Sequence, residues 1–141
     1  MRLEGSFFEI LDRTLPASAP AGAGEVLRPE ASEAVFRVRL NPEHIIYKAH
    51  FPEQPITPGV IIVRMAVELL SERLGRRVRL VAAPNIKFSS PLFPMPSAAS
   101  GIPGNEGREI DFKINIREEG LASVTVADAE VTYSKMLIRY E

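Results

Sequence analysis

The clearest alternation of apolar and polar positions lies in the last third of the chain. Four apolar side chains there are each separated by one polar side chain: Ile110, Phe112, Ile114 and Ile116. This two-residue period is typical of a strand with one buried face. A turn is predicted at 118–120, and two further strands are predicted over 121–127 and 131–140, joined at 128–129.

Two more strands are predicted in the first third of the chain. Residues 34–40 place four apolar side chains on one face: Ala34, Phe36, Val38 and Leu40. Residues 7–15 are ambiguous, because Phe8 and Ile10 fit the alternation of a strand whereas Phe7, Ile10 and Leu11 fit a short helix; the strand is favoured. The stretch 16–24 is rich in Pro, Ala and Gly and is predicted to be a loop, and 41–43 to be a turn or a helix start.

Between these strands the period changes to that of a helix. Apolar side chains recur at steps of three and four residues: Ile61, Ile62, Met65, Ala66, Leu69 and Leu70. We predict a helix from about Pro58 to Leu74, with Thr57 as its N-cap and Gly75 as its C-cap. Its polar residues fall on one stripe: Arg64, Glu68, Ser71 and Glu72. The rest of its surface is apolar and is expected to lie against a sheet.

After the helix, a strand is predicted to begin over 76–80, to break or bulge at Pro84, and to resume over 85–88. Residues 97–107 are small, polar and Gly-rich, and are predicted to form an exposed connection. One long helix among five or six mostly hairpin-linked strands indicates an α+β fold with an antiparallel sheet. The length of 141 residues fits a single domain, 1–141.

Composition narrows the class of function. The net charge of −1 provides no bulk field that would recruit nucleic acid or a membrane surface. The chain has no cysteine, which excludes disulfides, thiolate nucleophiles and cysteine metal sites and is compatible with the cytosol, so we expect a cytoplasmic protein. Its apolar runs are too short to span a bilayer, and its first residues do not resemble a signal peptide. Two histidines and scattered carboxylates form no metal motif, so neither a metal nor a cofactor is expected.

The most distinctive stretch begins at His50. Prolines follow at positions 52, 55 and 58, and because proline fixes φ and lacks an amide donor, 50–55 is neither a helix nor a central strand. A stiff loop that carries a histidine therefore leads into a helix, and the unpaired amides near Gly59 at its start favour a partial negative charge. An imidazole with an unperturbed pKa of about 6.5 is available as a neutral base at pH 7.

The seven positions His50-Phe51-Pro52, Pro55 and Pro58-Gly59-Val60 resemble the signature of the 3-hydroxyacyl-[acyl carrier protein] dehydratases, which have the hot-dog fold. The resemblance implies an antiparallel sheet of five to six strands wrapped around one long central helix, and a homodimer or a higher oligomer of dimers. It also implies that His50 takes the C2 proton of an acyl thioester while the N–H of Gly59 holds the thioester carbonyl. Phe51, Pro58 and Arg64 are the other residues expected to contact the substrate.

Arg64 departs from the family pattern. It stands five residues after the glycine, where the family has a carboxylate that protonates the leaving hydroxyl, and a guanidinium cannot be a general acid near neutral pH. Glu68, one turn or roughly 5–6 Å further along the helix, is the alternative catalytic acid, and Arg64 would then orient it or bind an acidic substrate. Taken alone, the two residues form an ordinary helix-surface ion pair. Two lesser departures are Ala49, where glycine is usual, and Thr57, where a bulkier apolar residue is usual.

We therefore expect a dehydratase-like protein that acts on acyl thioesters of an acyl carrier protein or coenzyme A, in fatty acid or polyene-type lipid synthesis. Two alternatives stay open. One is a catalytically silent hot-dog subunit that binds acyl chains or pairs with an active homologue. The other is an acyl thioesterase in which Glu68 or Glu53 activates water. A basic cluster near the predicted helix end either receives an acidic carrier protein or is simply solvated: Arg73, Arg76, Arg77 and Arg79.

Overall fold

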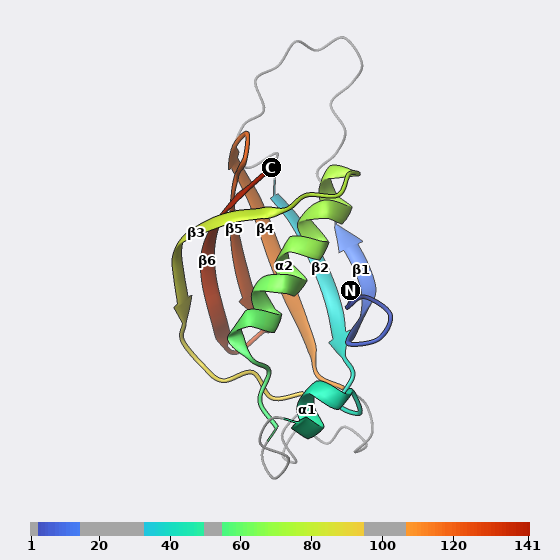
Figure 1. The fold of residues 1–141 in the computed structure, drawn as a ribbon. Coiled ribbons are helices and arrows are strands. Elements are labelled where there is room, and N and C mark those ends of the chain that lie inside the picture. Colours follow the sequence, from blue (N-terminus) through green and yellow to red (C-terminus); the bar gives the residue numbers. More distant parts are fainter. Residues whose placement is uncertain (1–2, 15–32, 50–54, 95–106) are drawn as a thin grey trace.

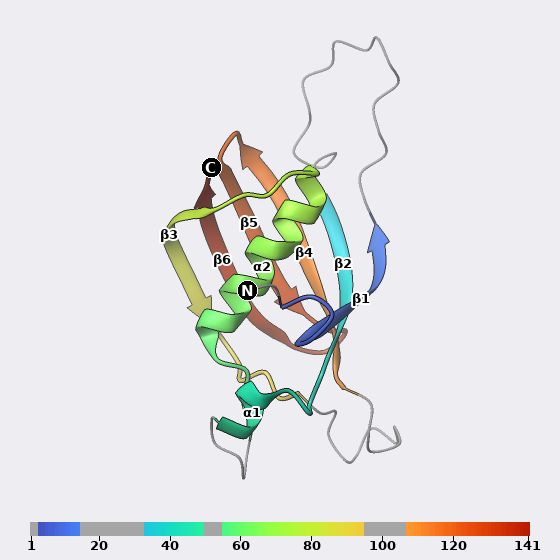
Figure 2. The ribbon, with the colours of Figure 1, turned by 45° about the vertical axis from the view of Figure 1, so that its right-hand side comes forward.

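An antiparallel six-stranded sheet forms the frame of the protein, with strand order β1-β2-β4-β5-β6-β3. The structure is a computed structural model, and it describes residues 3–14, 33–49, 55–94 and 107–141. Figures 1 and 2 show helix α2 lying across one face of the curved sheet. The elements in chain order are β1 (Phe8–Thr14), β2 (Glu33–Leu40), α1 (Ile45–Ala49), α2 (Gly59–Leu74), β3 (Leu80–Phe88), β4 (Glu109–Glu118), β5 (Leu121–Ala127) and β6 (Thr132–Tyr140).

The core lies between α2 and the central strands. Phe36 on β2 pairs with Phe112 on β4, which pairs in turn with Val126 on β5, and all three are fully buried. Of the intervening residues, Arg37 and Lys113 are exposed and Val35 and Asp111 are half-buried. The predicted alternation of both strands is thus confirmed, and one face of the sheet faces the helix while the other faces outward.

Helix α2 confirms the predicted periodicity and nearly the predicted bounds. Its buried residues are Ile62, Met65, Ala66, Leu69 and Leu70, and it ends at Gly75, which adopts the left-handed φ of 69° that a C-cap requires. The predicted long central helix is a moderate one of 16 residues. The predicted N-cap is wrong: Pro58 occupies that position without a side-chain cap bond, because the Thr57 hydroxyl is bound to Tyr47 instead.

Strand β3 begins later than predicted. Residues 76–78 precede the sheet, and Val78 N–H donates to Ser71 Oγ of α2 at 3.0 Å. Pairing with β6 starts at Arg79, because Arg79 and Glu141 exchange two backbone hydrogen bonds of 3.0 Å beside the Leu80–Tyr140 pair. The predicted break near Pro84 is confirmed by a shift of register between Ala82 and Asn85. Along residues 7–15 the favoured strand is confirmed as β1.

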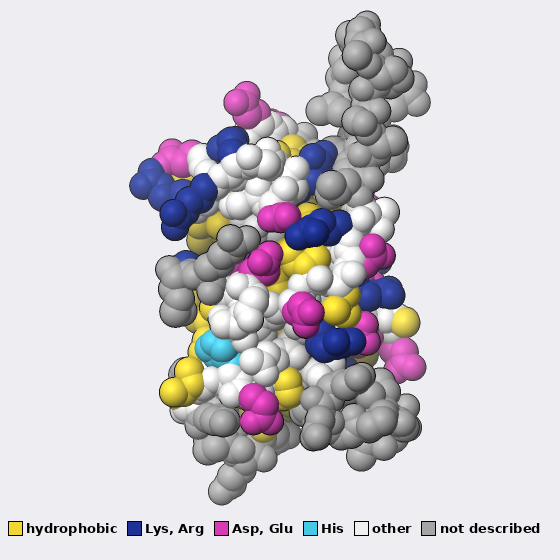
Figure 3. Space-filling view, turned by 90° about the vertical axis from the view of Figure 1, so that its right-hand side faces the viewer, with side chains coloured by type: hydrophobic (Ala, Val, Ile, Leu, Met, Phe, Trp, Pro, Cys, Tyr) yellow, Lys and Arg dark blue, Asp and Glu magenta, His cyan; other side chains and the backbone are white. Residues whose placement is uncertain are grey.

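The predicted loop at 16–24 lies outside the described residues, as does all of the predicted connection 97–107 except its last residue. Helix α1 was not predicted beyond a possible helix start at 41–43. On the side of the molecule that carries β1, acidic and basic side chains are interspersed with apolar ones (Figure 3). One such pair joins β1 to the helix, with Arg13 Nη2 lying 2.9 Å from Glu72 Oε1.

A cluster around Asp128 closes the β5–β6 turn. Its Oδ1 accepts the N–H groups of Glu130 and Val131 at 2.9 and 2.8 Å. Its Oδ2 accepts a short hydrogen bond from the Tyr133 hydroxyl and lies 3.6 Å from Arg108 Nη1. Burial alone raises the pKa of Asp128, but these hydrogen bonds and Arg108 together outweigh burial, so that the pKa lies below its ordinary value of 3.8. Burial and the neighbouring carboxylate raise the pKa of Tyr133 to about 12.

Asp128→Asn is expected to lower stability at neutral pH by about 1–2 kcal/mol and to flatten its loss in acid. Because the folded pKa is depressed, the carboxylate stabilises the fold above its unfolded pKa, and this contribution is lost as pH falls through the folded value. Urea unfolding from about pH 7 to about pH 3 measures the difference, which should shrink below the ordinary pKa. The matched control is Asp111→Asn, which removes an exposed bond to Arg37. A difference between wild type and Asp128→Asn that is independent of pH would contradict this role.

Candidate active site

The predicted site residues divide between described and undescribed parts of the chain. His50 and Phe51 lie outside the described residues. The other predicted residues belong to α2, with Pro58 and Gly59 at its start and Arg64 and Glu68 on its next two turns. The structure therefore describes the helix half of the predicted site.

The start of α2 presents two unpaired amides. Pro58 is extended, with φ of −60° and ψ of 143°, and its carbonyl accepts the N–H groups of Ile61 and Ile62 at 3.0 and 3.2 Å. Within the described part of the chain, the N–H groups of Gly59 and Val60 have no acceptor. Such groups at a helix N-terminus can hydrogen-bond an oxygen that gains negative charge.

Phe88 lies directly against this helix start. A Cβ placed on Gly59 would lie 2.7 Å from Cζ of the Phe88 ring, which is closer than carbon atoms approach. The glycine is therefore required as long as the ring holds its place. Phe88 is on edge strand β3 and is 50% exposed, so its ring forms an apolar wall beside the unpaired amides. Sequence reasoning missed this residue, because no local pattern relates positions 59 and 88.

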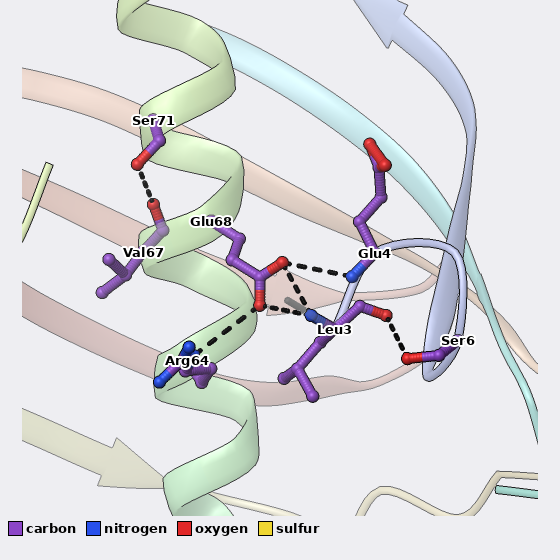
Figure 4. Close-up of polar contacts among 7 residues, drawn as sticks. All are labelled: Leu3, Glu4, Ser6, Arg64, Val67, Glu68 and Ser71. Carbon is purple, nitrogen blue, oxygen red and sulfur yellow. Dashed lines mark hydrogen bonds and ion pairs between the residues drawn. The ribbon is translucent and has the colours of Figure 1, made fainter. Parts of the chain in front are cut away.

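Glu68 binds the turn at residues 3–7, which we call the N-terminal turn (Figure 4). Both of its carboxylate oxygens lie 2.9 Å from the backbone N of Leu3, and Oε1 also accepts the N–H of Glu4 at 3.1 Å. The predicted ion pair is confirmed, since Arg64 Nε lies 3.8 Å from Glu68 Oε2. The Glu68 side chain is only 17% exposed, whereas that of Arg64 is 47% exposed. A role of Glu68 as proton donor thus requires at least one amide hydrogen bond to be exchanged.

A groove of about 1370 Å³ runs along the outer side of α2. Its walls come from three elements: Phe8 and Ile10 of β1, Val63 and Arg64 of α2, and Leu80 of β3. Arg64 and Glu68 both line it. The Arg64 side chain, which is about half exposed, therefore forms part of the groove wall. Among the described residues, no group of three or more His, Cys, Asp or Glu is arranged to hold a metal ion, and none of the described helices is long and apolar enough to cross a membrane.

Glu68→Ala is expected to lower the free energy of unfolding by about 2 kcal/mol, because the Leu3 amide loses its acceptor in a partly buried place. Glu68→Gln keeps one carbonyl oxygen and should lose less. Urea unfolding compares both with Glu72→Ala, which removes only the exposed pair with Arg13 and should change stability by less than about 0.5 kcal/mol. Equal stability of Glu68→Ala and wild type would show that Glu68 does not hold the N-terminal turn.

Comparison with known proteins identifies relatives over most of this architecture. Residues 27–125 match the family model of the ApeI-like dehydratases, described as ApeI dehydratase. Two similar curated proteins are the 3-hydroxyacyl-[acyl-carrier-protein] dehydratases FabZ of Brucella ovis and Brucella suis. Each is 35% identical over 72 residues, a match that covers 45% of this chain and 45% of the relative. The match therefore spans less than half the length of these curated relatives.

Two solved structures share the fold. The dehydratase heterocomplex ApeI:P from Xenorhabdus doucetiae superposes with a TM-score of 0.67 at 22% identity, over 94% of this chain and 96% of the other. An uncharacterized protein from Erwinia carotovora subsp. atroseptica superposes with a TM-score of 0.58 at 18% identity, over 78% and 83% of the two chains. The match to the family model extends from before β2 to within β5 and so includes the signature and all of α2. The chain belongs to the ApeI-like dehydratase family.

Proposed function

We propose that this protein is a hot-dog dehydratase that removes water from a 3-hydroxyacyl thioester to give a 2-enoyl thioester. The observation that carries the proposal is the pair of unpaired amides at Gly59 and Val60, directly after the signature that contains His50. The acyl carrier is an acyl carrier protein or coenzyme A, and the FabZ relatives are named for the former. We place the reaction in fatty acid or polyene-type lipid synthesis in the cytoplasm.

In the proposed reaction the C2 proton passes to the neutral imidazole of His50. The electron pair left at C2 is delocalised onto the thioester carbonyl, whose oxygen then accepts the N–H of Gly59. The pair returns to form the C2–C3 double bond as the C3–O bond breaks, and the hydroxyl leaves as water once it receives a proton. The Phe88 ring beside Gly59 limits access of bulk water to the carbonyl, which strengthens this hydrogen bond.

The donor of the last proton is Glu68 in this proposal, with Arg64 holding its carboxylate from one side. In a dimer of the kind the resemblance implies, the groove along α2 faces His50 of the partner subunit. Strand β3 supports such pairing, because this edge strand exposes Leu80, Val81 and Phe88. We therefore propose a homodimer in which each site takes His50 from one subunit and the α2 stripe from the other.

Hydration of 2-enoyl thioesters by the purified protein tests this function. Substrates on an acyl carrier protein and on coenzyme A should both be offered, since loss of the enoyl absorbance reports the reaction on either carrier. A thioesterase would instead release free thiol, which a thiol reagent detects. Glu68→Gln should lower kcat by about tenfold or more if Glu68 is the acid. Full activity of Glu68→Gln would remove it from that role.

A second function is favoured by the residue found where the family has its catalytic carboxylate. Arg64 stands there, and the nearest alternative, Glu68, already binds two backbone amides. A subunit of this kind would hold substrate and pair with an active homologue that supplies the carboxylate, and a related structure is described as a dehydratase heterocomplex. In that case the purified protein alone would be inactive, and hydration would appear only after a homologue with the helix carboxylate is added.

A further inference from the structure

We propose that the hydrogen bond between Tyr47 and Thr57 is a positioning device, which fixes the first turn of α2 for the dehydration step. This inference rests on the proposed function and extends it to residues outside the signature's predicted chemistry. We use the name hydroxyl clamp for the bonded hydroxyls of Tyr47 and Thr57 together with the Phe7 ring that stacks on Tyr47. The clamp joins three segments: the N-terminal turn, helix α1 and the residues that lead into α2.

The central contact of the clamp is a buried hydrogen bond of ordinary length. The Tyr47 hydroxyl lies 2.7 Å from Thr57 Oγ1, and the two residues are only 2% and 3% exposed. Burial raises the pKa of Tyr47 above its ordinary value, so its hydroxyl keeps its proton. Thr57 is held on its other side as well, because its N–H donates to Leu92 O at 2.8 Å. The residue two positions before Gly59 therefore has both its backbone and its side chain fixed.

The Tyr47 ring is fixed in turn by the N-terminal turn. The fully buried ring of Phe7 stacks on it, with 5.0 Å between centroids and 25° between planes. Phe7 donates its N–H to Leu3 O at 2.7 Å, and Leu3 is bound to Glu68 on α2. These contacts form a continuous path from the middle of α2 back to its start. The stacked and buried ring holds the Tyr47 hydroxyl beside Thr57 Oγ1.

The two hydroxyls of the clamp lie on either side of the signature in the sequence. Tyr47 and Thr57 are ten residues apart in sequence, and His50 lies between them, outside the described residues. The hydrogen bond therefore joins a residue before His50 to a residue after it. Because Thr57 precedes Gly59 by two residues, the direction of the unpaired Gly59 amide depends on the same bond. Misplacement of a reacting group by about 1 Å can cost a factor of about 10² in rate, so the loss of this bond should be visible in kcat.

The presence of Thr57 follows from this geometry. A bulkier apolar residue is usual at this position in the dehydratases that the signature resembles, and such a residue would leave the buried Tyr47 hydroxyl without a partner. The two hydroxyls are therefore needed together or not at all. Replacing both by apolar groups of the same shape removes the bond without leaving a polar group unpaired, which can be nearly neutral for stability.

The test uses Tyr47→Phe, Thr57→Val and the double variant. Each single variant should be less stable than wild type, because one buried hydroxyl stays unpaired, and the double variant should recover most of that stability. Hydration of a 2-enoyl thioester should nevertheless be about tenfold slower in kcat in all three variants, with KM within about twofold of wild type. Thr57→Ser, which keeps a hydroxyl, should restore kcat. Tyr140→Phe is the matched control and should leave kcat unchanged.

Hydrogen–deuterium exchange provides a second readout that needs no activity. The amides of Ile61 and Ile62, which bond to Pro58 O, should exchange about tenfold faster in the double variant than in wild type. If wild type hydrates no thioester, the proposed function fails. Hydrogen–deuterium exchange then still tests whether the clamp holds the first turn of α2. Unchanged exchange in the double variant overturns the proposal. So does faster exchange with a wild-type kcat, because the bond would then be structural only.

Discussion

His50→Ala is expected to reduce the rate of 2-enoyl thioester hydration by about 10²–10⁴-fold, which is the usual contribution of a positioned general base. The C2 proton of a thioester is only weakly acidic, so its transfer requires both a base and a group that stabilises the developing charge on the carbonyl. In the proposed reaction the unpaired amide of Gly59 supplies the second of these. Without the imidazole, no positioned base removes the C2 proton, so the negative charge that the amide would stabilise on the carbonyl seldom develops. Progress curves at saturating substrate measure the effect in kcat.

The other histidine of the chain provides the matched control. His44 Nδ1 accepts the N–H of Ile46 at 3.1 Å, and its ring packs against that of Phe7 in a T-shaped arrangement with 5.1 Å between centroids. His44→Asn keeps a side-chain acceptor near the start of α1, so its kcat should stay within about twofold of wild type. Similar losses in both variants would indicate that the two substitutions disturb folding. A His50→Ala variant with full activity would show that the base lies elsewhere.

Phe112→Ala is expected to lower the free energy of unfolding by about 3–5 kcal/mol. Phe112 is fully buried at the centre of the sheet and lies between Phe36 on β2 and Val126 on β5. Its removal leaves a cavity in the row of side chains beneath α2, and neighbouring strands cannot close it without losing their register. The midpoint of thermal unfolding should fall by roughly 10–20 °C.

Lys113→Ala is the control for this variant, because its side chain lies on the exposed face of the same strand. It should change the free energy of unfolding by less than about 0.5 kcal/mol. Thermal unfolding followed by circular dichroism compares the three proteins. A loss of less than about 1 kcal/mol in Phe112→Ala would mean that the core beneath α2 is not packed around this ring.

The sequence predicted best where structure depends on neighbours along the chain. The alternation in β4 and the period of α2 arise from which side chains face the core, and both are visible within a window of about ten residues. Gly75 was identified as the C-cap for the same reason. The roles of all the candidate site residues stay predictions. The structure shows where Gly59, Arg64 and Glu68 lie on α2, whereas His50 and Phe51 lie outside the described residues.

The remaining features join positions that are far apart in sequence. Glu68 binds the amide of Leu3, which is 65 positions away in sequence. Phe88 on β3 packs against Gly59 at the start of α2. Thr57 was assigned as an N-cap from its local context, but a buried partner, Tyr47, takes its hydroxyl. Residues 76–78 were expected to begin a strand yet precede β3, since Ser71 Oγ on α2 accepts the N–H of Val78. At Thr57 and at residues 76–78, tertiary contacts overrode the local preference.

The product formed from a 2-enoyl thioester is the most direct test of the proposed dehydratase activity. The purified protein should be incubated with a 2-enoyl-[acyl carrier protein], and the mass of the acyl group then measured with the thioester intact. We expect the addition of one water to give the 3-hydroxyacyl thioester, and no such product with His50→Ala. Free thiol and a fatty acid, or an unchanged enoyl group with wild-type protein, would contradict the proposed function.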